Sequence, residues 1–279
     1  MKINLRKKAY VYLVLLLFIL PGGAYCHVGE HSLIKLFSDK IKTDPENPVL
    51  YFKRGSQHRY AGHFEKALED FSKARSLDEE YFLVDLGVGL VFLDYGWNKT
   101  AEVYLKSFLK YSPDHIVGMT SLARAIARQK RGKESAALYE HISKILEKPA
   151  PAFYLEMADS YLITNNYSAA IKTLDNGIKK LGHITSLDQK AYEIELNTKL
   201  TDKALLRLDN LIKYSPQKER WLYEKGQLLE QEDEYDKAKD AYLKALEHYS
   251  SRPIKRQNIP VLVRLKKNID LALDRIGQR

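Results

Sequence analysis

The sequence has little of what most protein chemistry requires. Its 279 residues include one cysteine, Cys26, so no disulfide can form within the chain and thiol redox chemistry is not expected. No glycine-rich phosphate loop, nucleophile elbow or His-Glu-x-x-His zinc helix is present. Because no set of acid, base and nucleophile can be assembled from motifs, the sequence predicts a protein that is not an enzyme and has no cofactor.

Glycine and proline are also scarce, at 14 and 9 residues, and most of them fall where turns are expected. Between these turns the sequence is 45% hydrophobic and 29% charged, with apolar and charged positions alternating along helical segments. Such a balance excludes an extended disordered chain and leaves enough apolar content for a continuous core.

The net charge of +9 does not indicate nucleic-acid binding once it is divided along the chain. The first eight residues contain four basic and no acidic residues, so the rest carries 9 − 4 = +5. From there to Ser250, basic and acidic residues are interleaved, as on solvated helix faces. A basic concentration follows, which predicts the polar face of a capping helix, with an anionic docking patch as the alternative. It comprises Arg252, Lys255, Arg256, Arg264, Lys266 and Lys267.

Residues 1–26 have the three parts of a secretory signal peptide. A basic start is followed by an apolar run, residues 9–20, and then by Pro21-Gly22-Gly23 and a stretch of small residues. Twelve helical residues rise about 18 Å, less than a hydrocarbon core of about 30 Å, so no permanent membrane span is expected after cleavage. The sequence therefore predicts an exported protein, periplasmic or extracellular.

Cys26 stands where a bacterial lipoprotein carries its lipidated cysteine, which leaves lipid anchoring as an alternative. The residues before it, Gly23-Ala24-Tyr25, depart from that pattern, because Tyr25 is bulky and Gly23 replaces the usual leucine. Removal of Cys26 with the signal peptide is the favoured interpretation. A mature chain that starts at His27 would exclude the lipid anchor.

A period near 34 residues runs through the middle of the chain. Residues 48–78 carry Tyr51, Gly55, Gly62, Phe64, Ala67, Leu68, Phe71 and Ala74, and residues 219–250 place Gly226, Tyr235, Ala238, Tyr242 and Ala245 in the same frame. This spacing resembles the tetratricopeptide repeat. More degenerate copies occupy about 82–115, 118–148, 151–182 and 185–216, of which the last lacks the small residue early in its first helix.

The resemblance implies an all-α, right-handed superhelical solenoid of about six helix hairpins. Small residues would let the two helices of each hairpin approach closely, while large ones fill the space between hairpins. Apolar periodicity predicts amphipathic capping helices at 31–43 and 260–276. The expected organisation is a signal peptide (1–26), an N-terminal segment with a leading helix (27–47), the repeat array (48–250) and a C-terminal capping helix (251–279).

Members of this family usually bind extended peptides or partner helices in a concave groove lined by the first helix of each repeat. By spacing, the resemblance places nine residues in such a lining: Phe52, Ser56, Arg59, Leu155, Asp159, Arg220, Tyr223, Gln227 and Glu230. Repeats that clamp chaperone C-termini have Lys and Asn at two first-unit positions, which here are Phe52 and Ser56. That particular partner is therefore not expected.

Histidines gather near the start, at His27, His31, His58 and His63. If cleavage follows Cys26, the free amine and imidazole of His27, with His31 one turn later, could chelate Cu(II) or Ni(II). The simpler interpretation is a solvated N-terminus, and titration calorimetry of the mature chain would decide between the two.

The sequence thus predicts an exported scaffold that binds an unidentified protein or peptide through its concave surface. The opening His-x-Gly-x-His and Leu50 to Arg59 also resemble a recurring type of exported bacterial repeat protein. The alternative is a metal or small-ligand accessory protein that uses the histidine-rich start.

Overall fold

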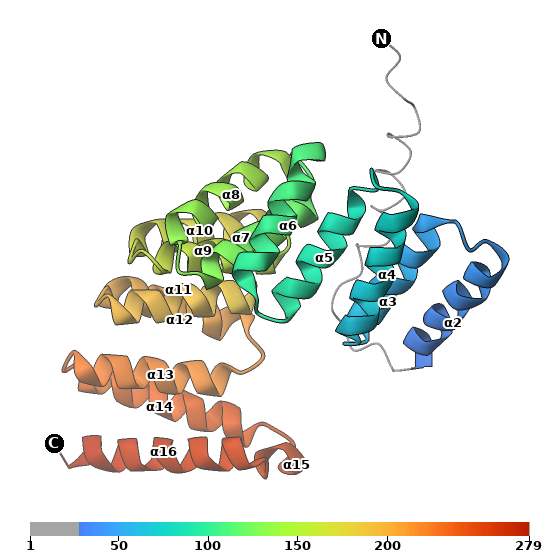
Figure 1. Ribbon diagram of the computed structural model, residues 1–279. Helices are drawn as coiled ribbons and strands as arrows, with labels where there is room; N and C mark the ends of the chain where they lie inside the picture. Colours follow the sequence, from blue (N-terminus) through green and yellow to red (C-terminus); the bar gives the residue numbers. More distant parts are fainter. Residues whose placement is uncertain (1–27, 279) are drawn as a thin grey trace. The chain divides into compact units, whose positions relative to one another are not determined.

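Every regular element between residues 28 and 278 is an α-helix (Figure 1). The computed structural model describes these residues, so the predicted signal peptide and His27 lie outside them. The chain divides into two compact units, residues 1–87 and 88–279. Each is described by itself below.

The first unit is built on three consecutive helices and the start of a fourth. These are α2 (Val28–Thr43), α3 (Pro48–Tyr60), α4 (Phe64–Leu77) and the beginning of α5 (Leu83–Asp94). Helix α2 packs on α3, and α3 packs on α4. A Cβ added to Gly55 of α3 would lie 2.8 Å from Cε1 of Phe71 in α4, which shows why only a small residue fits there.

The second unit continues the pattern as a series of helix pairs followed by a short and a long helix. Its elements after α5 are α6 (Asn98–Tyr111), α7 (Ile116–Arg128), α8 (Gly132–Ile145), α9 (Pro151–Leu162), α10 (Tyr167–Leu181), α11 (Thr185–Asn197), α12 (Thr201–Tyr214), α13 (Lys218–Gln231), α14 (Tyr235–Ser250), α15 (Ile254–Gln257) and α16 (Pro260–Gly277). From α6 to α14 each helix packs on the next, and α16 packs on α14. In Figure 1 the later pairs lie layer on layer.

The prediction of six helix hairpins with capping helices is confirmed. Hairpins 1 to 6 are α3–α4, α5–α6, α7–α8, α9–α10, α11–α12 and α13–α14, flanked by α2 and α16. Two details differ from the sequence prediction. Helix α2 begins at Val28 rather than at residue 31, and a four-residue helix, α15, precedes the closing helix.

The turn inside each hairpin has the same backbone conformation. One residue has a positive φ between 55° and 80°, and the next hairpin repeats it 34 or 35 residues later: Gly62, Gly96, Lys130, Asn165, Lys199 and Asp233. The residue after it donates its N–H to the carbonyl five positions earlier in every case, as His63 does to His58 and Leu200 does to Glu195. This pattern closes the first helix of each hairpin on its own carbonyls.

Close helix crossing also repeats with this period. The position of Gly55 returns as Gly89, Ala123, Ala158, Tyr192 and Gly226, and each faces a large buried residue of the second helix. In hairpin 6 a Cβ on Gly226 would lie 2.4 Å from Cε1 of Tyr242. Hairpin 5 is the exception that the sequence indicated, because Tyr192 occupies the position that is small elsewhere.

Candidate functional site

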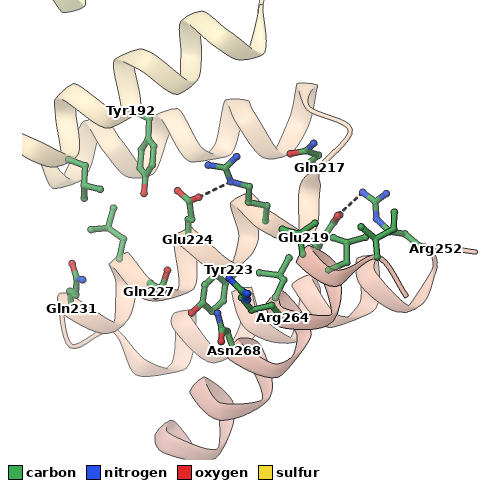
Figure 2. A pocket seen from close by; sticks show the side chains of 17 residues that line it. Tyr192, Gln217, Glu219, Tyr223, Glu224, Gln227, Gln231, Arg252, Arg264 and Asn268 are labelled. Atoms are coloured by element: carbon green, nitrogen blue, oxygen red, sulfur yellow. Dashed lines mark hydrogen bonds and ion pairs between the residues drawn. The ribbon is translucent and has the colours of Figure 1, made fainter. Parts of the chain in front are cut away.

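A cavity of about 710 Å³ lies in the second unit between α11, α13 and α16 (Figure 2). This volume is in the range of pockets that hold drug-sized molecules or a short peptide segment. Apolar side chains from all three helices line it together with amide and charged groups. The lining therefore combines a desolvating surface with polar groups that can fix an orientation.

Helix α13 supplies the floor of the cavity through one of its faces. Arg220, Tyr223, Gln227 and Gln231 recur at intervals of three or four residues, so they project from the same side of the helix. The opposite sides carry Leu222 and Leu229 into the core of the array. Amphipathic spacing thus presents the polar row to the cavity.

Helix α11 contributes the wall that contains Tyr192. Its ring meets Trp221 edge to face with 6.3 Å between centroids, and its hydroxyl lies on the cavity side in Figure 2. Burial raises the pKa of Tyr192, and the carboxylate of Glu224 raises it further. The phenol therefore stays protonated at neutral pH and is available as a hydrogen-bond donor.

Helix α16 forms the third wall, with Leu262 and Leu265 beside Arg264 and Asn268. An ion pair holds this helix against α13. The guanidinium of Arg275 donates to both carboxylate oxygens of Glu230, at 2.7 and 2.8 Å, and the hydroxyl of Tyr242 donates to the same group at 3.0 Å. Because one end of α16 is fixed in this way, the capping helix has a defined position opposite the polar row of α13.

The charges that line the cavity are mostly paired. Arg220 donates to Glu224 at 3.0 Å and lies over the ring of Trp221, while Arg252 pairs with Glu219 at 2.6 Å. Arg264 is exposed, and among residues 28–278 no carboxylate pairs with it. The cavity thus contains one cation that is available to an acidic ligand.

Three of the nine residues expected in the lining are brought together here, namely Arg220, Tyr223 and Gln227. Burial raises the pKa of Tyr223, so its hydroxyl is also neutral. The fourth residue of this repeat, Glu230, holds the capping helix through Arg275. Its carboxylate is occupied within the protein.

The expected residues of hairpin 4 lie on α9. Leu155 packs, partly buried, against the hydrophobic core of the second unit. Asp159 is exposed and accepts an ion pair from Lys190 of α11 at 2.8 Å. This pair links the first helices of two successive hairpins.

The expected residues of hairpin 1 lie in the first unit. Phe52 is buried, with its ring 5.5 Å from Phe71 and 5.6 Å from Tyr81. The hydroxyl of Ser56 donates to the carbonyl of Phe52 at 2.9 Å, and the guanidinium of Arg59 lies over the ring of Tyr60. Phe52 therefore serves the core of this unit.

The two residues predicted to bind metal, His27 and His31, have no described side chains. Within the described part of the chain, no three His, Cys, Asp or Glu side chains are grouped so as to hold a metal ion. A search of the same residues finds no helix with the length and apolar character of a membrane span.

Residues outside the sequence prediction complete the cavity. Tyr192 was recognisable only as a departure from a small residue, and Glu224 is one position from the expected Tyr223. Arg264 and Asn268 lie on a helix interpreted as a cap, whose contact with α13 is not visible in the sequence. The 34-residue alignment of Tyr192 with Gly226 is the signal that could have indicated a rebuilt helix crossing.

The fold and this geometry agree with the comparison with known proteins. A profile described as tetratricopeptide repeat matches residues 199–253, which include all of hairpin 6. This chain is a tetratricopeptide-repeat protein. Proteins built from tetratricopeptide repeats generally act as protein-interaction scaffolds and are typically non-catalytic.

Two relatives share part of the tetratricopeptide-repeat chain. Tetratricopeptide repeat protein 28 of Homo sapiens is 22% identical over 156 residues, which is 55% of this chain and 6% of that protein. Anaphase-promoting complex subunit 3 of Schizosaccharomyces pombe is 24% identical over 147 residues, or 52% and 22%. This chain thus spans less than a quarter of the length of either relative.

Among solved structures, the C-terminal part of a tetratricopeptide-repeat protein from Cytophaga hutchinsonii is similar, with a TM-score of 0.66 at 12% identity. The match covers 80% of this chain and 92% of that one. At this identity the likeness shows the shared fold alone.

Proposed function

We propose that this chain is an exported, non-catalytic scaffold that binds a segment of a partner protein in the cavity between α11, α13 and α16. The observation that carries the proposal is the convergence of a polar row, two neutral tyrosines and an apolar wall on one hollow. Amides such as Gln227 and Asn268 can pair with the backbone of a bound peptide, because an amide both donates and accepts.

The charge of the lining defines the ligand further. Arg264 lacks a carboxylate partner among the described residues and stands beside the apolar side chains of Leu262 and Leu265. A segment that carries a carboxylate next to an apolar side chain would satisfy both. The proposed partner is therefore a protein segment with an acidic group, and basic segments are disfavoured.

A photo-reactive amino acid at Gln227, which is exposed and lines the cavity, tests this proposal in the producing cells. The matched control places the same group at Lys239, exposed on α14 and outside the lining. Discrete cross-linked adducts are expected from position 227 and not from position 239. Mass spectrometry of the adduct identifies the partner.

A second variant separates specific binding from chance proximity. Arg264→Glu reverses the single available cation of the cavity without touching a buried side chain. The adducts from position 227 should fall at least about tenfold, since a charge-assisted contact becomes repulsive. Equal adducts from positions 227 and 239, or adducts insensitive to Arg264→Glu, would contradict the proposal.

Export is the second part of the proposal and rests on the basic, apolar and small-residue order of residues 1–26. Mass spectrometry of the mature N-terminus checks it. A chain beginning at His27 supports export and removal of Cys26, and a lipid-modified Cys26 would instead support an anchored form. An intact Met1 in the cell envelope or medium would argue against cleavage.

A further inference from the structure

The segment that joins hairpin 6 to the capping helix has an unusual surface. Between His248 and Ile269 the sequence contains six basic residues and no acidic one. Two of the six, Arg252 and Lys266, have carboxylate partners in Glu219 and Asp270. No carboxylate among residues 28–278 pairs with Lys255, Arg256 or Lys267, and all three are exposed.

Large aliphatic side chains are exposed beside these cations. Ile254 is 74% exposed and Val263 is 48% exposed. We call Ile254, Lys255, Arg256, Val263 and Lys267 the corner patch. They lie on α15 and on the first two turns of α16, two helices in contact with each other (Figure 1). Ile259 and Val261 are exposed nearby but line the cavity.

The backbone under the corner patch is held in place by polar contacts that point inward. The carboxamide of Gln257 donates to the carbonyl oxygens of Arg252 at 2.6 Å and Ser250 at 3.1 Å. The hydroxyl of Tyr249 donates to the carbonyl of Gln257 at 3.2 Å, and Arg252 donates to the carbonyl of Pro216 at 3.0 Å. With its polar groups bound to the protein, the corner leaves Ile254 and its basic neighbours facing solvent.

We propose that the corner patch docks the protein on the surface of an anionic phospholipid bilayer. Cations attract the negative headgroups, and exposed aliphatic side chains among them can enter the boundary between headgroups and acyl chains. A soluble polyanion would reward the cations alone. An acidic protein partner would need a shape complementary to Ile254 and Val263, whereas a bilayer adapts to protruding side chains.

The inference is separate from peptide binding, because none of the five residues lines the cavity. A bilayer contact at the corner patch would leave Gln227 and Tyr223 open to a peptide. A scaffold docked in this way would present its ligand close to the membrane.

Vesicle co-sedimentation tests the proposal, using the chain as obtained from the producing cells with one N-terminus common to all variants. The probes are vesicles of phosphatidylcholine and vesicles in which about a third of the lipid is phosphatidylglycerol, at about 0.15 M salt. Binding should be several-fold stronger to the anionic vesicles. Lys255→Glu/Arg256→Glu should weaken it by at least about 25-fold, since each cation near such a surface contributes about fivefold.

The chain offers a matched control for charge. Lys179 and Lys180 form an exposed basic pair in the last turn of α10, as Lys255 and Arg256 do in α15. Lys179→Glu/Lys180→Glu changes the net charge equally and should leave binding within about twofold of wild type. Equal losses from both pairs would show attraction by net charge alone and would overturn the proposal.

The apolar part has its own control. Ile254→Ser should weaken binding to anionic vesicles several-fold, and Leu206→Ser, at a side chain 67% exposed on α12, should not. No preference for anionic vesicles would overturn the proposal. An unchanged affinity of Ile254→Ser, with heparin bound as tightly as vesicles, would indicate a soluble polyanion or acidic protein instead. Cavity variants such as Arg264→Glu remain a separate test of peptide binding.

Discussion

Hairpins 5 and 6 share one backbone frame but seal it with opposite chemistry. Hairpin 5 buries Asp188, Glu195 and Arg207, whereas the positions 34 residues later in hairpin 6 are Leu222, Leu229 and Ala241, which are buried in a hydrophobic cluster. The 34-residue frame therefore accepts an ion network or an apolar core at the same three places. The difference lies in what a single substitution leaves behind.

The network of hairpin 5 centres on one guanidinium. Arg207 contacts Glu195 at 2.8 Å, Asp175 at 2.8 Å and Asp188 at 3.6 Å, and His183 lies 3.1 Å from Asp188. Burial alone would lower the pKa of Arg207, but the hydrogen bond and charge of Glu195 outweigh it and raise the pKa. Two buried carboxylates thus depend on one cation.

Arg207→Ala should have the largest effect on stability. Removing the guanidinium leaves Asp188 and Glu195 buried without their cation, which costs about 3–5 kcal/mol. Urea unfolding followed by circular dichroism measures the loss. As a control, Lys244→Ala, which breaks an exposed pair with Asp240 in hairpin 6, should change stability by less than about 0.5 kcal/mol.

A triple variant tests whether the network itself is required. Asp188→Leu/Glu195→Leu/Arg207→Ala gives hairpin 5 the residues of hairpin 6. The variant should be within about 1 kcal/mol of wild type or more stable, because an apolar set avoids the desolvation of three charges. A loss as large as that of Arg207→Ala would refute the equivalence of the two solutions.

The helix crossing distinguishes the hairpins next. Gly226→Ala should destabilise hairpin 6 by about 1–3 kcal/mol, because the new Cβ would overlap the ring of Tyr242. Hydrogen exchange of α13 and α14 localises the effect. In a Tyr242→Leu background, which copies the Leu208 of hairpin 5, the penalty should nearly vanish, and an undiminished penalty would show that the ring is not the obstacle.

Glu102 extends the comparison to hairpin 2, since the position 34 residues later is the buried Ala136. Burial alone would raise the pKa of Glu102, but hydrogen bonds from Lys106, Arg131 and Gln129 lower it to about 2 from 4.5. Glu102→Gln should cost about 1 kcal/mol at neutral pH.

The pH dependence gives a sharper result. A depressed carboxyl pKa stabilises the fold fully above 4.5, and this contribution is lost as the pH falls through about 2. Between these values the free energy of unfolding should therefore fall more steeply for wild type than for Glu102→Gln. Parallel acid titrations of the two proteins would contradict the assignment.

The turns should give the smallest effect. Lys199 of hairpin 5 has φ 57° where hairpins 1 and 2 have glycine. Lys199→Gly should stabilise by about 0.5 kcal/mol, because relief of the left-handed strain exceeds the added entropy of the unfolded chain. Thermal unfolding measures the gain. Gly62→Ala should shift the melting temperature in the opposite direction.

The hairpin frame is predictable from sequence because its determinants are local and periodic. Gly55, Gly226 and the buried residues opposite them recur at fixed spacing, so their pattern defines six hairpins. The cavity depends instead on contacts between α13 and α16, for which no repeat exists. Tyr192 illustrates the limit: its size predicts an altered crossing, while its direction toward Trp221 follows only from the packed structure.

The identical turns also determine where the chain tolerates changes of length. The positive-φ residue always lies two positions before the second helix, whereas the segments between hairpins vary, from Gly182–Ile184 to Leu146–Ala150. An inserted residue inside a turn would rotate one helix face away from the other. Added residues between hairpins leave each pair's internal alignment intact, so these segments are natural places for fluorescent labels or grafted domains.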